Sequence, residues 1–97
     1  MINWRDAISQ RLMVRFSYEG FERIVIPAAY GMNQRTGNEL VRAYQVGGGD
    51  ATRAIPAWSL FNAAKVVGAS MTGEQFDGIP PGYTRNDRAL DVIYAQL

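Results

Sequence analysis

The sequence predicts a mainly β protein: a small five-stranded barrel with one helix before it and one after it. Residues 14–31 contain two runs of alternating apolar and polar side chains, separated by Glu19 and Gly20, which is typical of a hairpin. Further short apolar segments lie between turn-forming residues, and five short strands with tight turns favour a strongly bent barrel. We assign residues 1–76 to the barrel with its first helix and residues 77–97 to a loop and C-terminal helix of the same domain.

The first helix is predicted to begin after Asn3. An asparagine at this position can cap the exposed N–H groups of the first turn, and Asp6 follows three residues later, as in a capping box. Residues at helical spacing then share one face: Trp4, Ala7, Ile8, Arg11 and Leu12. The helix should end near Arg11, and Trp4 should cover one end of the barrel core.

Three further strands are predicted after the hairpin. The third covers residues 39–46 and ends at a run of three glycines, Gly47 to Gly49. A short fourth strand, residues 52–55, stops at Pro56, because proline cannot donate to a strand ladder. The fifth strand covers residues 64–71.

Segments outside these strands have helix or loop signals. Pro56 is a good first residue for a helix, so residues 56–62 are predicted as one helical turn that points Trp58 and Phe61 inward. Residues 72–83 are rich in glycine and proline and are predicted as a loop.

The C-terminal segment is predicted to be helical. Thr84 and Asp87 form a second capping box. The apolar stripe that follows consists of Leu90, Ile93, Tyr94 and Leu97. This stripe could dock on the barrel or form a contact with a second copy of the chain or a protein partner, and the sequence leaves both open.

The composition argues against an enzyme. The chain has no cysteine and no histidine, so thiolate chemistry, disulfides and the commonest metal ligand and neutral-pH base are excluded. No nucleophile is spaced beside a base. The acids Glu39, Asp50 and Asp77 could form a paired-carboxylate site, but nothing in the sequence favours such a site over solvated surface acids. We expect no cofactor and no metal.

The sequence shows no sign of membrane insertion. The longest apolar run, residues 24–30, is too short to cross a bilayer, and the N-terminus lacks a secretory signal pattern. A soluble, cytoplasmic protein without membrane contact is therefore expected.

Arginine is the residue type that suggests binding. The net charge is only +1, yet all basic residues except Lys65 are arginines, whose planar fork suits phosphate, carboxylate or base edges. Arg23, Arg42 and Arg53 lie in or beside predicted strands, and Tyr44 shares a face with Arg42. These side chains could bind an anion or a stacked base, or the arginines could pair with surface acids.

The order of residues resembles the WYL domain family. The hairpin reads V-x-F-x-Y-x-G-x-x-R-x-V-x-P-x-x-x-G from Val14 to Gly31, followed by a strand, a glycine turn and T-R-A-I at residues 52–55. The likeness covers residues 4–76. At the Trp-Tyr-Leu triad that names the family, this sequence has Asn38, Glu39 and Leu40, so only the leucine is retained.

The resemblance implies an Sm-like, SH3-type five-stranded barrel. Members of the family serve in bacterial transcription regulators and beside anti-phage components, where they are thought to sense a ligand, often nucleic acid or a nucleotide. Arg23 and Arg53 match the family's arginines, and Tyr18 matches its first-strand tyrosine.

Two functions are therefore expected. The first is a regulatory module that binds single-stranded nucleic acid or a nucleotide through Arg23, Arg42, Arg53, Tyr18 and Tyr44. The alternative is a structural barrel that self-associates or binds a protein partner, with Leu90, Ile93, Tyr94 and Leu97 at the contact.

Overall fold

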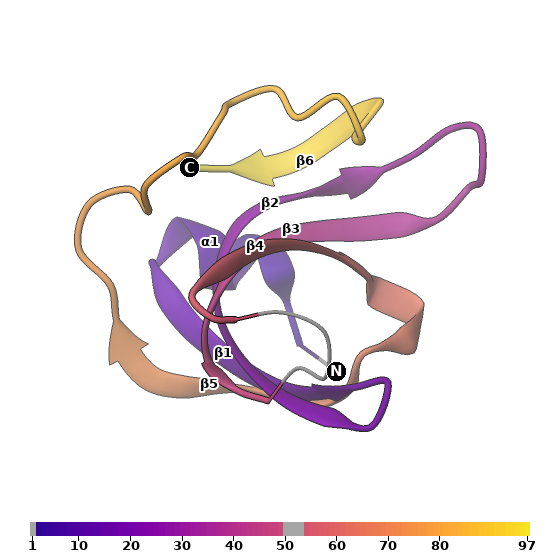
Figure 1. Ribbon diagram of the computed structural model, residues 1–97. Coiled ribbons are helices and arrows are strands. Elements are labelled where there is room, and N and C mark those ends of the chain that lie inside the picture. The colour runs from indigo at the N-terminus through magenta and orange to yellow at the C-terminus, as the bar shows by residue number, and fades with distance from the viewer. Residues whose placement is uncertain (1, 50–53) are drawn as a thin grey trace.

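The computed structural model describes residues 2–49 and 54–97 and shows a mainly β fold with one short α-helix (Figure 1). The elements, in chain order, are α1 (Trp4–Ser9), β1 (Leu12–Tyr18), β2 (Phe21–Met32), β3 (Glu39–Gly48), β4 (Ala57–Asn62), the 3₁₀ turn η1 (Ala63–Lys65), β5 (Val67–Gln75) and β6 (Val92–Gln96). No helix in the described ranges has both the length and the apolar character that a membrane span requires.

The strands form one antiparallel sheet in the order β4-β3-β2-β1-β5, with β6 added beside β2. Two strands pair with different parts of one edge of the long strand β2. Strand β1 pairs with it from Phe21 to Val25, and β6 pairs with it from Ala29 to Met32. In Figure 1 the yellow strand β6 lies next to the upper part of β2. The segment of the chain that is last in sequence thus completes the middle of the sheet.

The first hairpin is confirmed. Tyr18 pairs with Phe21, so only Glu19 and Gly20 form the turn. Both have positive φ, +52° and +83°, as a type I′ turn requires. Glycine adopts this conformation freely, and the turn has the twist that matches the two strands.

The core lies on one face of the curved sheet and is closed at one end by α1. Trp4 and Phe16 meet edge to face with ring centroids 6.0 Å apart, and Phe16 meets Phe61 in the same way at 5.0 Å. The buried core cluster consists of Trp4, Ala7, Val14, Phe16, Tyr18, Val25, Val41, Ala43 and Phe61. The expectation that Trp4 covers the core is met, since only 5% of its surface is exposed.

The helix start is also as expected. The side chain of Asn3 accepts from the Asp6 N–H at 3.1 Å and so caps α1. The helix ends at Ser9, two residues before the predicted end near Arg11, and Arg11 has positive φ, +54°, where the chain turns into β1.

The prediction of a closed five-stranded barrel is wrong in that the sheet is open. Strands β4 and β5 form its two edges, and they do not pair with each other within the described residues. The register of β5 against β1 shifts twice, and its glycines Gly68 and Gly73 have positive φ. Such bulges bend a strand and interrupt a regular ladder, so β5 pairs along one edge only.

The predicted C-terminal helix is absent, and strand β6 stands in its place. Val92, Ile93 and Tyr94 are β-branched or aromatic, and such residues favour a strand where an unpaired edge is present. Strand β2 presents that edge, and the ladder extends to a hydrogen bond from the Leu97 N–H to the Ala28 carbonyl at 2.9 Å. The stripe of Leu90, Ile93, Tyr94 and Leu97 is therefore not a helix face.

The predicted helical turn at residues 56–62 is also wrong, because β4 occupies Ala57–Asn62. Alternate residues Ser59 and Phe61 are buried, whereas Trp58 lies opposite Tyr44 on the other face of the sheet. Period-two burial, not helical spacing, governs the segment, so Phe61 points inward as expected and Trp58 does not.

The remaining boundaries shift by a few residues. The third strand extends to Gly48, and the fifth begins at Val67 and reaches Gln75, into the predicted loop. Of the predicted fourth strand at 52–55, residues 52 and 53 lie outside the described residues, and residues 54 and 55 are not in a strand.

Candidate functional site

The sequence-predicted site residues lie on two opposite faces of the sheet. Arg23 and Tyr18 are on the core side, whereas Arg42 and Tyr44 alternate with the buried Val41 and Ala43 on β3 and point the other way. Arg53 lies outside the described residues. The structure therefore brings Arg42 and Tyr44 together and separates them from Arg23 and Tyr18.

Arg23 is held inside the fold. Its side chain is 7% exposed, donates from Nη1 to Gln45 Oε1 at 3.3 Å, and donates from Nη2 to the Tyr18 carbonyl at 3.2 Å. The guanidinium also lies over the rings of Tyr18, Phe21 and Phe61, each within 5.8 Å of a ring centroid. Such contacts stabilise a desolvated arginine.

Tyr18 combines a core ring with a structural hydroxyl. Its ring is edge-on to Phe61 at 4.9 Å, and its hydroxyl accepts from the Asn62 N–H at 3.0 Å. That bond ties the end of β1 to the end of β4.

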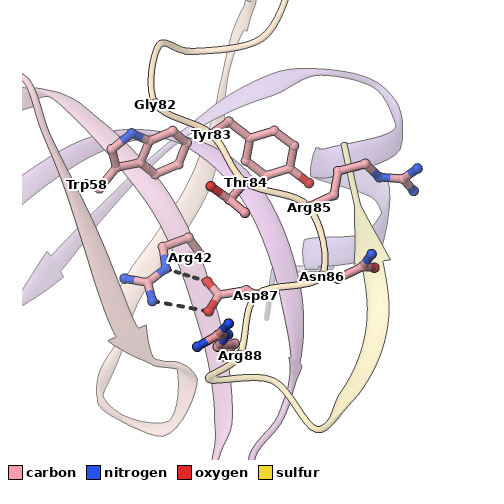
Figure 2. A pocket seen from close by; sticks show the side chains of 9 residues that line it. All are labelled: Arg42, Trp58, Gly82, Tyr83, Thr84, Arg85, Asn86, Asp87 and Arg88. Carbon is pink, nitrogen blue, oxygen red and sulfur yellow. Dashed lines mark hydrogen bonds and ion pairs between the residues drawn. The ribbon is translucent and has the colours of Figure 1, made fainter.

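A pocket opens on the face of the sheet opposite the core. Its volume of about 560 Å³ is within the usual range for small-ligand sites. Its floor includes Arg42 and Trp58 from neighbouring strands β3 and β4. Its rim is a segment of the strap, our name for residues 76–91 between β5 and β6. Figure 2 shows the lining residues, which are Arg42, Trp58, Gly82, Tyr83, Thr84, Arg85, Asn86, Asp87 and Arg88.

One wall of this pocket is aromatic. Trp58 and Tyr83 are stacked with ring centroids 6.0 Å apart and planes 29° apart, and Tyr44 supports Trp58 at 5.1 Å. The polar atoms of both pocket rings have partners: Trp58 Nε1 donates to the Pro81 carbonyl at 2.8 Å, and the Tyr83 hydroxyl donates to the Leu97 carbonyl at 3.0 Å. The rings are thereby fixed in position.

Gly82 allows the strap to approach this wall closely. Its φ is +81°, and a Cβ at this position would lie 3.2 Å from Trp58 Nε1. A larger residue would push the strap away from Trp58 and widen the aromatic wall.

The charge of the pocket is positive. Three arginines, Arg42, Arg85 and Arg88, and a single acid, Asp87, line it, which leaves a net charge of +2. Arg42 is paired with Asp87 through Nε–Oδ2 at 2.5 Å and Nη2–Oδ1 at 3.3 Å (Figure 2). In the part of the chain that the structure describes, neither Arg85 nor Arg88 forms an ion pair.

Two titrating groups in the pocket report these contacts. The hydrogen bond from Arg42 is the largest cause that lowers the pKa of the Asp87 carboxyl below its usual value, with smaller help from the Ala89 N–H. Burial raises the pKa of the Tyr83 phenol, and the nearby positive charge of Arg85 partly opposes the rise. Arg85 therefore lies close to Tyr83, at the edge of the aromatic wall.

A second hollow of about 760 Å³ lies at the end of the sheet beside Ile2 and Trp4. Glu39 is the one charged residue that lines it, and Glu39 accepts a hydrogen bond from the Tyr30 hydroxyl at 3.0 Å. Burial is the largest cause that raises the pKa of Tyr30. No group of three metal-ligating side chains occurs among residues 2–49 and 54–97.

Sequence reasoning missed most of the pocket. Trp58 was expected in the core, and Tyr83, Arg85 and Arg88 were divided between a loop and a helix. A usable signal was the dense set of an aromatic and two arginines within residues 83–88, directly after the Pro-Pro-Gly turn. Their meeting with Arg42 depends on a contact between residues 45 positions apart, which the sequence pattern does not predict.

Comparisons of this chain with protein-family models, curated proteins and solved structures give no match. The pocket must therefore be interpreted from its own chemistry.

Proposed function

We propose that this protein is a binding module for an anionic ligand with an aromatic group, a nucleotide or a short stretch of single-stranded nucleic acid, which it binds in the pocket between β3, β4 and the strap. The observation that supports this most is the presence of two arginines without ion-pair partners, within the described residues, beside a fixed aromatic wall. Charge and a π-face together are what such a ligand requires.

This site differs from the one expected from the sequence. It retains Arg42, and Tyr44 contributes by supporting Trp58, but Arg23 and Tyr18 serve the core. The arginine fork suits phosphate oxygens, because it can donate two parallel hydrogen bonds to them. The rings can stack on a base whatever its sequence.

We further propose that the fold is a WYL-like, SH3-type small barrel that has remained open. Its support is the sequential strand order and the short 3₁₀ turn η1 between the two edge strands β4 and β5. A regulatory or accessory role in the cytoplasm of a bacterium or in a phage follows from this proposal.

The first test is fluorescence anisotropy with short labelled single-stranded DNA and RNA at two salt concentrations. We expect the double variant Arg85→Ala/Arg88→Ala to bind at least about tenfold more weakly, since charge-assisted hydrogen bonds contribute about 1.5–3 kcal/mol each. The matched control is Arg15→Ala/Arg35→Ala, which removes the same charge from exposed positions outside the pocket. Equal losses in both variants would refute the site.

The aromatic wall is tested by calorimetry with adenosine monophosphate and ribose 5-phosphate. Stacking on an aromatic side chain contributes about 1–3 kcal/mol per base, so the nucleotide should bind roughly 5- to 150-fold more tightly. Equal affinities would limit the proposal to a plain anion site. No binding of any probe would favour the alternative function, a structural module with a protein partner.

A further inference from the structure

One of the three arginines in the pocket, Arg42, is already paired with a carboxylate of the protein itself. The Asp87 carboxylate takes both Nε and Nη2 of Arg42, in the side-by-side arrangement that a phosphate would use. Asp87 Oδ1 also accepts from the Ala89 N–H at 3.0 Å, which fixes its orientation. With 13% of its side chain exposed, Asp87 lies largely out of the solvent.

The strap that presents Asp87 is anchored on both sides of the pocket. Before the pocket, Trp58 donates to the Pro81 carbonyl. After it, Asn33 Nδ2 donates to the Ala89 carbonyl at 3.1 Å, and the Gln34 N–H donates to Asp91 Oδ2 at 2.6 Å. Within the rim, the Tyr83 hydroxyl donates to the Leu97 carbonyl, and Asn86 and Gln96 exchange two hydrogen bonds. Residues 87–88 lie between these contacts and the Ala89 anchor, and the Arg42–Asp87 pair joins this short segment to the sheet.

We propose that Asp87 is an internal competitor for the anion site on Arg42, and that binding of an external anion displaces it and releases residues 87–89, while Tyr83 and Asn86 stay bound. This inference rests on the function proposed above and adds the regulation of the same site. Both anions compete for one guanidinium, so their effects are reciprocal. The free energy by which the Arg42–Asp87 pair weakens ligand binding equals the free energy by which ligand binding weakens that pair.

The charges indicate which ligand can displace Asp87. Asp87 offers one negative charge and compensates Arg42 alone. A phosphate monoester near neutral pH has close to two negative charges and three strong acceptor oxygens, so it can replace Asp87 on Arg42 and still offer oxygens to a second donor. A monoanionic carboxylate offers Arg42 nothing beyond what Asp87 supplies.

The test compares Asp87→Asn with Asp77→Asn in the full chain. Both substitutions remove one negative charge from the strap and keep the side-chain shape, but Asp77 is exposed and does not line the pocket. Adenosine monophosphate and acetate are titrated against each by calorimetry. We expect Asp87→Asn to bind adenosine monophosphate about two- to fivefold more tightly than wild type, the range expected for a partly exposed ion pair, and Asp77→Asn to match wild type.

A second measurement follows the displacement directly. In ¹⁵N NMR spectra the Arg42 Nε–H should shift when adenosine monophosphate binds wild type, and the amides of residues 87–89 should exchange faster, because the Ala89 N–H loses its Asp87 acceptor. In Asp87→Asn the nucleotide should leave the exchange of these amides unchanged or slow it.

The outcomes separate the two proposals. The internal competitor would be overturned if Asp87→Asn did not bind the nucleotide more tightly than wild type, or if the nucleotide slowed exchange at residues 87–89 of wild type. Either result would leave the proposed function standing. Acetate binding as tight as that of the nucleotide would also overturn it. Absence of binding by every variant would overturn both.

Discussion

Asp87 and Arg42 form a pair whose two partners differ in exposure, 13% for the acid side chain and 30% for the base. This partial burial strengthens the electrostatic attraction relative to a surface pair, but desolvation offsets part of the gain. The lowered pKa of Asp87 shows that the attraction and hydrogen bonds outweigh the desolvation.

We expect this pair to make folding stability depend on acid pH. Because the pKa of Asp87 is lower in the folded state, its contribution is present above the unfolded value of about 3.9 and is lost as the pH falls through the folded pKa. Urea unfolding of wild type and Asp87→Asn between about pH 2 and 6 checks this. A wild-type acid slope no steeper than that of the variant would contradict it.

Removal of the Tyr18 hydroxyl distinguishes a structural role of this residue from a role in ligand binding. Tyr18→Phe removes the hydroxyl that accepts from the Asn62 N–H. We expect a loss of about 1 kcal/mol in the free energy of unfolding, with nucleotide affinity unchanged. Chemical denaturation and calorimetry on the same sample measure both, and a weaker affinity would place Tyr18 in the binding site after all.

Residue types were predictable where residue faces were not. The sequence indicated arginines beside aromatics, and both Arg23 and Arg42 do lie near aromatic rings. Alternation on β3 could not show which face is buried, since both faces have apolar residues. Arg23 and Arg42 lie on opposite faces of the sheet, and the packing of Phe16 and Phe61 decides which face is buried. Such tertiary packing is not visible in the local sequence pattern.

At the scale of elements, β6 shows how a free edge overrides a helical pattern. Residues 84–97 have capping residues and apolar side chains at helical spacing, yet the β-branched and aromatic residues at 92–94 pair with β2 as a strand. The local preference for helix is weak compared with a ladder of backbone hydrogen bonds to the unpaired edge of β2. The first hairpin was predictable, since its turn and its partner strand are adjacent in sequence.

The pairing of β2 with β6 depends on a close approach at Gly31. A Cβ there would lie 2.1 Å from the Val92 carbonyl oxygen. We expect Gly31→Ala to destabilise the fold by about 2–3 kcal/mol, as overpacking against backbone does, and to expose β6 amides to hydrogen exchange.

Gly47→Ala provides the comparison for this change. Its Cβ would meet the flexible side chain of Ile24 at 3.1 Å, which can move. Its cost should therefore be smaller, below about 1.5 kcal/mol. Thermal unfolding of both variants decides, and equal losses would mean that β6 does not depend on Gly31.

Leu90 anchors the strap before β6 begins and is 5% exposed. Leu90→Ala should cost about 2–4 kcal/mol through lost burial and a residual cavity. Leu60→Ala, at a position 36% exposed, should cost clearly less. Denaturant titration compares them; similar losses would show that Leu90 is not a core residue.

The whole molecule has little net charge, +1, while one pocket concentrates three arginines against one acid. The salt dependence of the binding constant should therefore reflect the number of phosphate contacts in the pocket and not the net charge of the protein. Two arginines that neutralise two phosphates of a single strand predict a slope of about −1.4 in log affinity against log salt. Anisotropy titrations at four salt concentrations measure it, and an unchanged slope in Arg85→Ala/Arg88→Ala would contradict the local site.

The shared edge of β2 has a further consequence for the order of folding. β6 pairs with residues some 60 positions earlier in the chain, so its docking closes a long loop and should be among the late steps. Until residues 92–96 have been synthesised, residues 29–32 at one edge of β2 have no strand to cover them. An uncovered edge can pair with another chain, so truncation before β6 should produce aggregates more readily than it produces a stable shorter domain.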